Sequence, residues 1–267
     1  MNRPYRLSIR SVLILGSLLA SISTAVIPMA GLALGNNGSS SSSSNSAFCN
    51  TELPAKQTEF IGNLANLVTK MNAAWQQQDS NLTTIAQNVD QKVAAARAAA
   101  AQKLTAAFTE LQSKTTTASE QTAVLTYEAA VNQAVAARES ANDSAASTFR
   151  AGVASAISAR QTTIGGQATT FQNSVKAAFS TASSACSAGT QTAASIRAAL
   201  ISSLQAARTT FQGDRSSDTK VTAEVQQLAQ TRDAAFQTND QTFQSAVQAA
   251  AGALKTAFGA NSSSVTG

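Results

Sequence analysis

Two cysteines are the side chains of this sequence that are best suited to chemistry. Cys49 and Cys186 are the only cysteines in 267 residues, and there is no histidine. Because histidine is the commonest general base and metal ligand, its absence argues against zinc sites and catalytic triads. Two isolated cysteines in an exported protein most often form one disulfide. We therefore interpret Cys49 and Cys186 as a structural bridge, and we assign no catalytic, metal-binding or cofactor-binding residue.

The carboxylates and the glycines give no stronger chemical signal. The fourteen acidic residues are scattered singly among polar residues, which is typical of solvated helix faces rather than of paired general acids and bases. Gly165-Gly166 follows no predicted strand and has no adjacent lysine, so it indicates a bend rather than a phosphate-binding loop. These observations favour a protein that is not an enzyme.

The first 35 residues form a predicted export segment. Arginines up to Arg10 precede an apolar run over residues 12–34. Small residues offer a cleavage site after Ala25, and Ala33-Leu34-Gly35 offers a second one. We interpret residues 1–35 as a signal peptide or, if uncleaved, as an N-terminal anchor that contacts the membrane through residues 11–35. In both cases we expect the rest of the chain to be extracytoplasmic, either secreted or anchored at its N-terminus.

Much of the positive net charge comes from this leader. Three of the nineteen basic residues, Arg3, Arg6 and Arg10, lie in it, which leaves sixteen basic against fourteen acidic residues in the rest of the chain. Those remaining charges alternate in sign, as in Arg138-Glu139, with no basic cluster that could collect phosphates. We therefore do not expect nucleic acid as a partner.

Helix is the only regular structure that the remaining composition favours. Residues 36–46 contain six consecutive serines and no apolar residue, so we expect a flexible linker over 36–48. Beyond it alanine, glutamine, serine and threonine dominate, and Pro54 is the only proline. Large apolar residues recur at helical spacings from Phe60 onwards, at Leu64, Leu67, Val68, Met71, Trp75, Leu82, Ile85, Val89 and Val93. The sequence predicts an all-α protein with long helices.

A turn is predicted near residue 117. Thr117-Ala118-Ser119-Glu120 has the form of a capping box, in which Thr117 and Glu120 satisfy free backbone donors at the start of a helix. Thr117 also lies midway between Cys49 and Cys186, so two equal antiparallel arms would bring the cysteines together. One unbroken helix would instead separate the two sulfurs by roughly 200 Å. The bridge and the turn therefore depend on each other.

The expected bundle has two hairpins and about four helices in a coiled-coil-like arrangement. We expect a disulfide-closed helical hairpin over 49–188, a C-terminal helical hairpin over 189–260 and a disordered tail over 261–267. Uninterrupted arms would be roughly 90–100 Å long. Helix interruptions that would give a shorter bundle stay open at 78–81, 142–145 and 165–166, and so does the oligomeric state. Because many stripe positions are alanine, the bridge is the main expected source of stability, about 4–5 kcal/mol.

The layout resembles one group of proteins. An apolar leader, a polar linker, a cysteine near the mature start in Phe48-Cys49-Asn50 and long helices are similar to those of uncharacterised exported helical proteins of ultrasmall candidate-phylum bacteria. This resemblance covers the general layout only and implies no activity.

The expected function is structural. We expect a non-catalytic cell-envelope or surface protein that serves as a helical spacer, stalk or adhesion and interaction module, with an unknown protein or envelope component as partner. The alternative is an amphipathic helical bundle that binds lipid or an apolar small molecule. Narrow apolar stripes, filled out with alanine and without a lysine-bordered aromatic face, favour the spacer.

Overall fold

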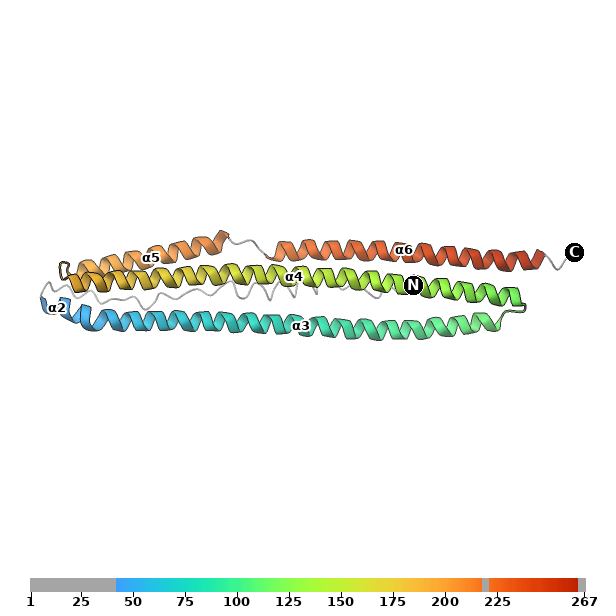
Figure 1. Ribbon diagram of the computed structural model, residues 1–267, viewed down its shortest axis with the longest axis horizontal. Helices are drawn as coiled ribbons and strands as arrows, with labels where there is room; N and C mark the ends of the chain where they lie inside the picture. Colours follow the sequence, from blue (N-terminus) through green and yellow to red (C-terminus); the bar gives the residue numbers. More distant parts are fainter. Residues whose placement is uncertain (1–41, 218–220, 264–267) are drawn as a thin grey trace. The chain divides into compact units, whose positions relative to one another are not determined.

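The described part of the chain is helical apart from two short turns. The computed structural model describes residues 42–217 and 221–263 (Figure 1). In chain order the elements are α2 (Ser42–Ala47), the π-helical turn η2 (Phe48–Glu52), α3 (Leu53–Ser113), α4 (Ala118–Ala188), α5 (Ala193–Ser217) and α6 (Val221–Ser263). These residues contain no strand, which confirms the all-α prediction. The predicted export segment, residues 1–35, lies outside the described residues.

Helices α3 and α4 are both uninterrupted. Helix α3 has 61 residues and α4 has 71, and they continue through all three places where the sequence left an interruption open. A glycine in a helix costs about 1 kcal/mol relative to alanine, which is too little to end a helix that is packed along its length. Gly165 and Gly166 follow Ile164, whose side chain is only 5% exposed, so packing keeps α4 helical there.

The π turn before α3 is explained by Pro54. Proline lacks an N–H, and its ring clashes with the carbonyl four residues earlier in a regular α-helix. One residue before Pro54, the N–H of Leu53 donates to the carbonyl of Phe48, five residues back. The helix widens locally and continues, so α2, η2 and α3 follow one another without a break.

Two sequence-based expectations for the ends of the body differ from the structure over the residues that it describes. Residues 42–48 are helical, whereas we expected a flexible linker over 36–48; residues 36–41 lie outside the described residues. Tertiary contacts outweigh the serine-rich composition here, because Phe48 is 1% exposed and packs in the core. At the other end α6 continues to Ser263, since no proline ends it earlier, so residues 261–263 of the expected tail are helical; residues 264–267 lie outside the described residues.

The turn between α3 and α4 is closed by side chains rather than by glycine. The Thr117 hydroxyl accepts a hydrogen bond from the Glu120 N–H at 3.2 Å, and the Glu120 carboxylate accepts one from the Thr117 N–H at 3.1 Å. The same carboxylate also accepts from the N–H of Thr116 at 2.8 Å. Residues 114–117 therefore form the turn, with the predicted capping box at the start of α4.

The turn between α4 and α5 uses a left-handed glycine. Gly189 has φ +66°, and its N–H donates to the carbonyls of Ala185 and Cys186, which have no partner further along α4. Helix α5 then begins with Thr192 as its cap, because the Thr192 hydroxyl accepts from the Ser195 N–H at 3.2 Å. The chain thus reverses direction within four residues, 189–192.

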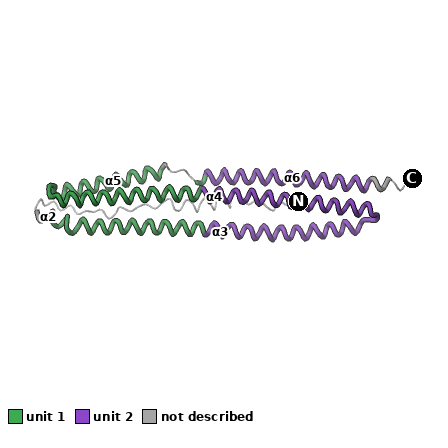
Figure 2. Tube along the Cα trace, in the orientation of Figure 1, with its two compact units in different colours: residues 1–79, 156–222 green, residues 80–155, 223–267 purple. Residues whose placement is uncertain are grey.

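The chain divides into two compact units (Figure 2). Unit 1 comprises the residues up to Asp79 together with Ala156–Thr222, and unit 2 comprises Ser80–Ser155 together with the residues from Ala223. The division therefore cuts across α3 and α4, whereas the boundary expected from the sequence, between residues 188 and 189, falls at the turn between α4 and α5.

Unit 1 contains the larger apolar core. Aromatic rings join its helices: Phe60 of α3 lies 6.2 Å from Phe179 of α4, and Phe171 of α4 lies 5.3 Å from Phe211 of α5, measured between ring centroids. The buried cluster consists of Phe48, Leu53, Leu64, Phe171, Val175, Ala178, Phe179, Ala182, Ala193, Ile196, Leu200 and Leu204. Contacts from three segments converge here, so this unit is held mainly by the hydrophobic effect.

Unit 2 has a thinner apolar core, in which α4 packs against both α3 and α6. Phe108 of α3 meets Tyr127 of α4 edge-to-face at 6.0 Å between ring centroids. On the α6 side the helices approach closely, because a Cβ added to Gly152 would lie 2.7 Å from a methyl carbon of Leu228. Helix α4, which is described over its full length, has no buried apolar residue between Ala134 and Val153. Polar side chains fill that stretch instead.

Candidate functional site

The predicted bridge is present in unit 1. Cys49 and Cys186 form a disulfide with their Cα atoms 5.6 Å apart, at the point where the N-terminal end of α3 meets the C-terminal end of α4. Both cysteines are half-buried and pack against the apolar cluster of unit 1. The capped turn at Thr117 and Glu120 connects α3 to α4 at one end of the antiparallel hairpin. The bridge connects the same two helices where the hairpin would otherwise be open.

Polar contacts around the bridge tie the N-terminal segment to the start of α5. Arg197 pairs with Glu52, and its guanidinium lies 4.5 Å from the centroid of the Phe48 ring. The side-chain oxygen of Asn45 accepts a hydrogen bond from the N–H of Ala193, one of the free donors at the start of α5. Asn45 and the Thr192 cap together bind two of these donors, the N–H groups of Ala193 and Ser195, so the bridge region joins three segments of the chain.

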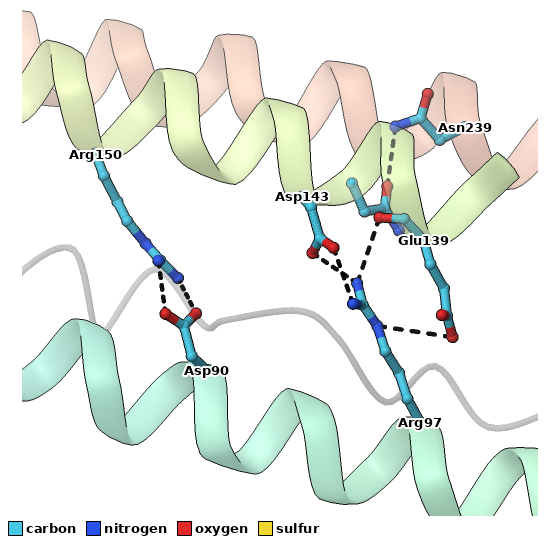
Figure 3. A network of polar contacts seen from close by, with 7 residues as sticks. Asp90, Arg97, Glu139, Asp143, Arg150 and Asn239 are labelled. Atoms are coloured by element: carbon cyan, nitrogen blue, oxygen red, sulfur yellow. Dashed lines mark hydrogen bonds and ion pairs between the residues drawn. The ribbon is translucent and has the colours of Figure 1, made fainter. Parts of the chain in front are cut away.

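A second set of polar residues links α3 to α4 in unit 2, where the apolar core is thin (Figure 3). Arg150 binds Asp90 through both terminal guanidinium nitrogens, one of them at 2.8 Å. Arg97 binds both oxygens of Asp143, at 2.9 and 2.7 Å, and lies 3.6 Å from the Glu139 carboxylate. We call these five residues the ion-pair ladder. Two-point contacts of this kind fix geometry as well as attraction.

The spacing of the ion-pair ladder favours one register of α3 against α4. Asp90 and Arg97 are seven residues apart on α3, and their partners Arg150 and Asp143 are seven residues apart on α4. A slip of one heptad in one direction would place Asp90 opposite Asp143. A slip in the other direction would place Arg97 opposite Arg150. Both slips bring like charges together, so the ladder acts against the alternatives that a repetitive, alanine-rich stripe would otherwise allow.

The charge state of the ladder is held by its own contacts. Hydrogen bonding from Arg150 lowers the pKa of Asp90, and hydrogen bonding from Arg97 lowers the pKa of Asp143. In turn, the hydrogen bond to Asp90 raises the pKa of Arg150. Asp90, Asp143 and Arg150 therefore keep their charges at neutral pH, which suits a permanent cross-link between helices.

Helix α6 is joined to the neighbouring face of α4 by a related set of contacts. Arg138 donates to Asp240 at 2.7 Å, and its guanidinium lies 5.0 Å from the centroid of the Phe243 ring. The side-chain amide of Asn239 donates to the side-chain oxygen of Asn142 at 2.9 Å (Figure 3). A half-buried amide pair is a known determinant of register between helices, because each amide loses its partner if the helices slide.

Arg232 is the most deeply buried charged side chain among the described residues, and it also lies between α6 and α4. It is 7% exposed, and its guanidinium lies 4.5 Å from the Phe149 ring centroid and 5.9 Å from that of Phe236. Its charge is balanced by Asp233, which accepts at 2.7 Å. Stacking between two aromatic rings lets this arginine fill a core position on the stripe of α6.

The sequence pointed to the bridge and the cap but not to the ladder or to Arg232. The missed signal was a pair of opposite charges seven residues apart on each arm, Asp90 with Arg97 and Asp143 with Arg150. Such mirrored charges become informative once an antiparallel hairpin is assumed. Trp75, which the sequence places on the apolar stripe, is half-buried on α3.

Two further properties of the described residues bear on the site. No three of their cysteine, aspartate or glutamate side chains gather in a way that could hold a metal ion. Among the helices described here, none is both long and apolar enough to cross a membrane.

Comparisons with known proteins add no relative to this description. No protein-family model matches the chain, and no curated protein or solved structure matches it either.

Proposed function

We propose that the chain is a non-catalytic, exported cell-envelope or surface protein whose helical body acts as a spacer, stalk or interaction module. The observation that carries this proposal is the pairing of two uninterrupted helices, α3 and α4, by contacts spaced along their length. Each carboxylate of the ion-pair ladder is engaged by an arginine, so the charges are used for cohesion between helices. A body of this kind works by holding its ends apart and by presenting polar helix faces.

Export is supported by two features. The arginine-then-apolar leader precedes the body, and the disulfide suits an oxidising compartment. The proposal predicts that an epitope tag placed after residue 267 lies outside the cytoplasmic membrane: in the medium, on intact cells, or in the fraction released when only the outer layers of the envelope are opened. A tag that is reached only after the cytoplasmic membrane is permeabilised would contradict export.

The competing function, binding of lipid or an apolar molecule, is tested on the purified body, residues 36–267. The spacer proposal predicts that the body stays in the supernatant when it is centrifuged with vesicles of phosphatidylcholine and phosphatidylglycerol. Sedimentation with the vesicles would contradict the spacer and favour the lipid-binding bundle. Phe236 and Phe243 of α6 are half-buried and lie on the stripe that contacts α4. A variant with serine at both positions is the control for vesicle binding through these rings: if they bound the vesicles, the variant would sediment less than the parent.

A further inference from the structure

The bridge closes a covalent loop around almost the whole α3–α4 hairpin. Cys49 lies just before α3 begins at Leu53, and Cys186 lies just before α4 ends at Ala188. The two cysteines are 137 residues apart in sequence. Helices α5 and α6, together with the residues that precede Cys49, lie outside this loop.

This topology determines how a pulling force travels between the two ends of the body. A force applied before α2 and after α6 reaches Cys49 from one side and Cys186, through α5, from the other. With the bridge intact, the shortest covalent path runs directly from Cys49 to Cys186. The residues between them are therefore not part of the path under tension, and they cannot be drawn out while the disulfide holds.

Without the bridge, the same force would open the hairpin from its end. Because α3 and α4 are antiparallel, Cys49 and Cys186 lie at the same end, and separating them breaks the cross-helix contacts one after another. In order along the two arms these contacts are Phe60–Phe179, Asp79–Gln161, Asp90–Arg150, Arg97–Asp143 and Gln112–Glu128. Solvent screens the attraction between exposed polar pairs, so each of the polar steps is individually weak.

The non-covalent contacts beside the bridge offer limited resistance of their own. The Arg197–Glu52 pair retains 18% and 31% side-chain exposure, and the Asn45 contact to Ala193 is a hydrogen bond. These contacts position α2 and η2 against α5 at rest. Because they are non-covalent, a pulling force would break them before it breaks the S–S bond.

We propose that the Cys49–Cys186 bridge makes the chain a redox-dependent tether, in which the oxidised form has a short reach under load and the reduced form a long one. A dithiol reductant performs the switch: its thiolate attacks one cysteine sulfur, the S–S bond breaks, and its second thiol resolves the mixed disulfide. Two electrons and two protons pass to the chain, which then holds two thiols, while the reductant becomes a disulfide. The biological meaning rests on the proposed spacer function, whereas the mechanical property belongs to the isolated chain.

The size of the switch follows from the loop. Releasing 137 residues at about 3.3–3.6 Å each adds roughly 450–490 Å of contour length. Optical tweezers can measure this on the body, residues 36–267, held by cysteine-free peptide tags at both ends. We expect the oxidised chain to unfold by extending only the residues outside the loop, and dithiothreitol to lengthen the full extension by this amount.

The matched control is the double variant Cys49→Ser, Cys186→Ser, which should show the long extension with or without reductant. If this variant does not fold, adding and removing reductant on one wild-type molecule gives the same comparison. The proposal is overturned if the bridge of the folded chain, followed by non-reducing peptide mapping, survives dithiothreitol at concentrations that reduce it in the urea-unfolded chain. It is also overturned if reduction leaves the extension unchanged. Either result leaves the vesicle and surface-accessibility tests of the proposed function intact.

Discussion

Replacing Asp90 by arginine is expected to weaken the pairing of α3 with α4 in unit 2, and replacing Arg150 by aspartate at the same time is expected to restore most of it. The single variant removes a two-point ion pair and places two arginines opposite each other. The double variant exchanges the two charges and keeps the pair. This cycle tests whether charge complementarity, rather than the presence of particular side chains, contributes to the register.

The magnitude follows from the exposure of the two side chains. Arg150 is 40% exposed and Asp90 is 57% exposed, so solvent screens their attraction. Losing such a pair costs about 0.5–1 kcal/mol, and the new repulsion adds a similar amount. We expect Asp90→Arg to lower the free energy of unfolding by about 1–2 kcal/mol, and the double variant to lie within about 0.5 kcal/mol of the parent. In a chain of this size, each kcal/mol shifts Tm by about 2–4 °C.

Urea and thermal unfolding, followed by circular dichroism at low salt and at about 1 M NaCl, measure these differences. At about 1 M salt the Debye length falls to about 3 Å, so much of the Asp90→Arg deficit should disappear. Gln91→Arg is the matched control, because residue 91 is an exposed neighbour on the same helix. The reasoning is refuted if the single and double variants lose equal stability, or if the loss does not respond to salt.

Three further predictions concern the turn, the helix contacts and acid stability. Thr117→Ala should cost about 1 kcal/mol in urea denaturation because it removes the cap of α4, whereas Thr117→Ser should keep most of the stability; equal losses would contradict the cap. Gly166→Ala should raise the free energy of unfolding by about 1 kcal/mol, because nothing lies near the added methyl group. Gly152→Ala should be less stable than Gly166→Ala by about 1 kcal/mol or more, because Leu228 must move. Equal gains in the two variants would contradict the close α4–α6 approach. Because the folded-state pKa of Asp143 is lowered from its usual 3.8, its stabilisation is present above that value and is lost as the pH falls through the folded pKa. An acid titration should therefore show that Asp143→Asn loses less stability than the parent below about pH 4, and parallel losses would contradict this role.

The hairpin was predictable because two independent patterns agreed on it. The capping box at Thr117 and Glu120 and the midpoint between the cysteines both placed a turn near residue 117. The cap forms through hydrogen bonds between residues close in sequence. The disulfide requires its two Cα atoms to lie within a few ångströms, which in a chain of long helices requires a reversal of direction. Both are short-range constraints, so the sequence can express them without knowledge of the packing.

The register of the arms was not predictable from the same reasoning. Counting inward equally from Cys49 and Cys186 places Asp90 opposite Ala145, five residues from its actual partner Arg150. The bridge reaches across the end of the hairpin next to a π turn, so its pairing is offset from that of the helices. An alanine-rich stripe presents a similar surface after each shift of seven residues, so the stripe alone does not select one register. The charges of the ion-pair ladder select it only when the two arms already lie side by side.

The helical start of the body was missed for a similar reason. The serine-rich residues before Cys49 have little intrinsic preference for helix. Their order comes from contacts made far away in the sequence, by Asn45 with Ala193 and by Phe48 with Arg197. Local composition does not predict these contacts, because they form only when the segments around the disulfide have packed together.

The central claim, a closed antiparallel hairpin with this register, is tested most directly by one distance in unit 2. Spin labels attached through unnatural amino acids at Asn88 of α3 and Ala151 of α4, both exposed, leave the native cysteines untouched. Packed helix axes are about 8–10 Å apart, so pulsed dipolar spectroscopy should give a narrow distribution at roughly 15–25 Å once the label arms are included. One continuous helix would instead separate these labels by roughly 95 Å, and a distribution that is broad or lies beyond roughly 50 Å would contradict the hairpin.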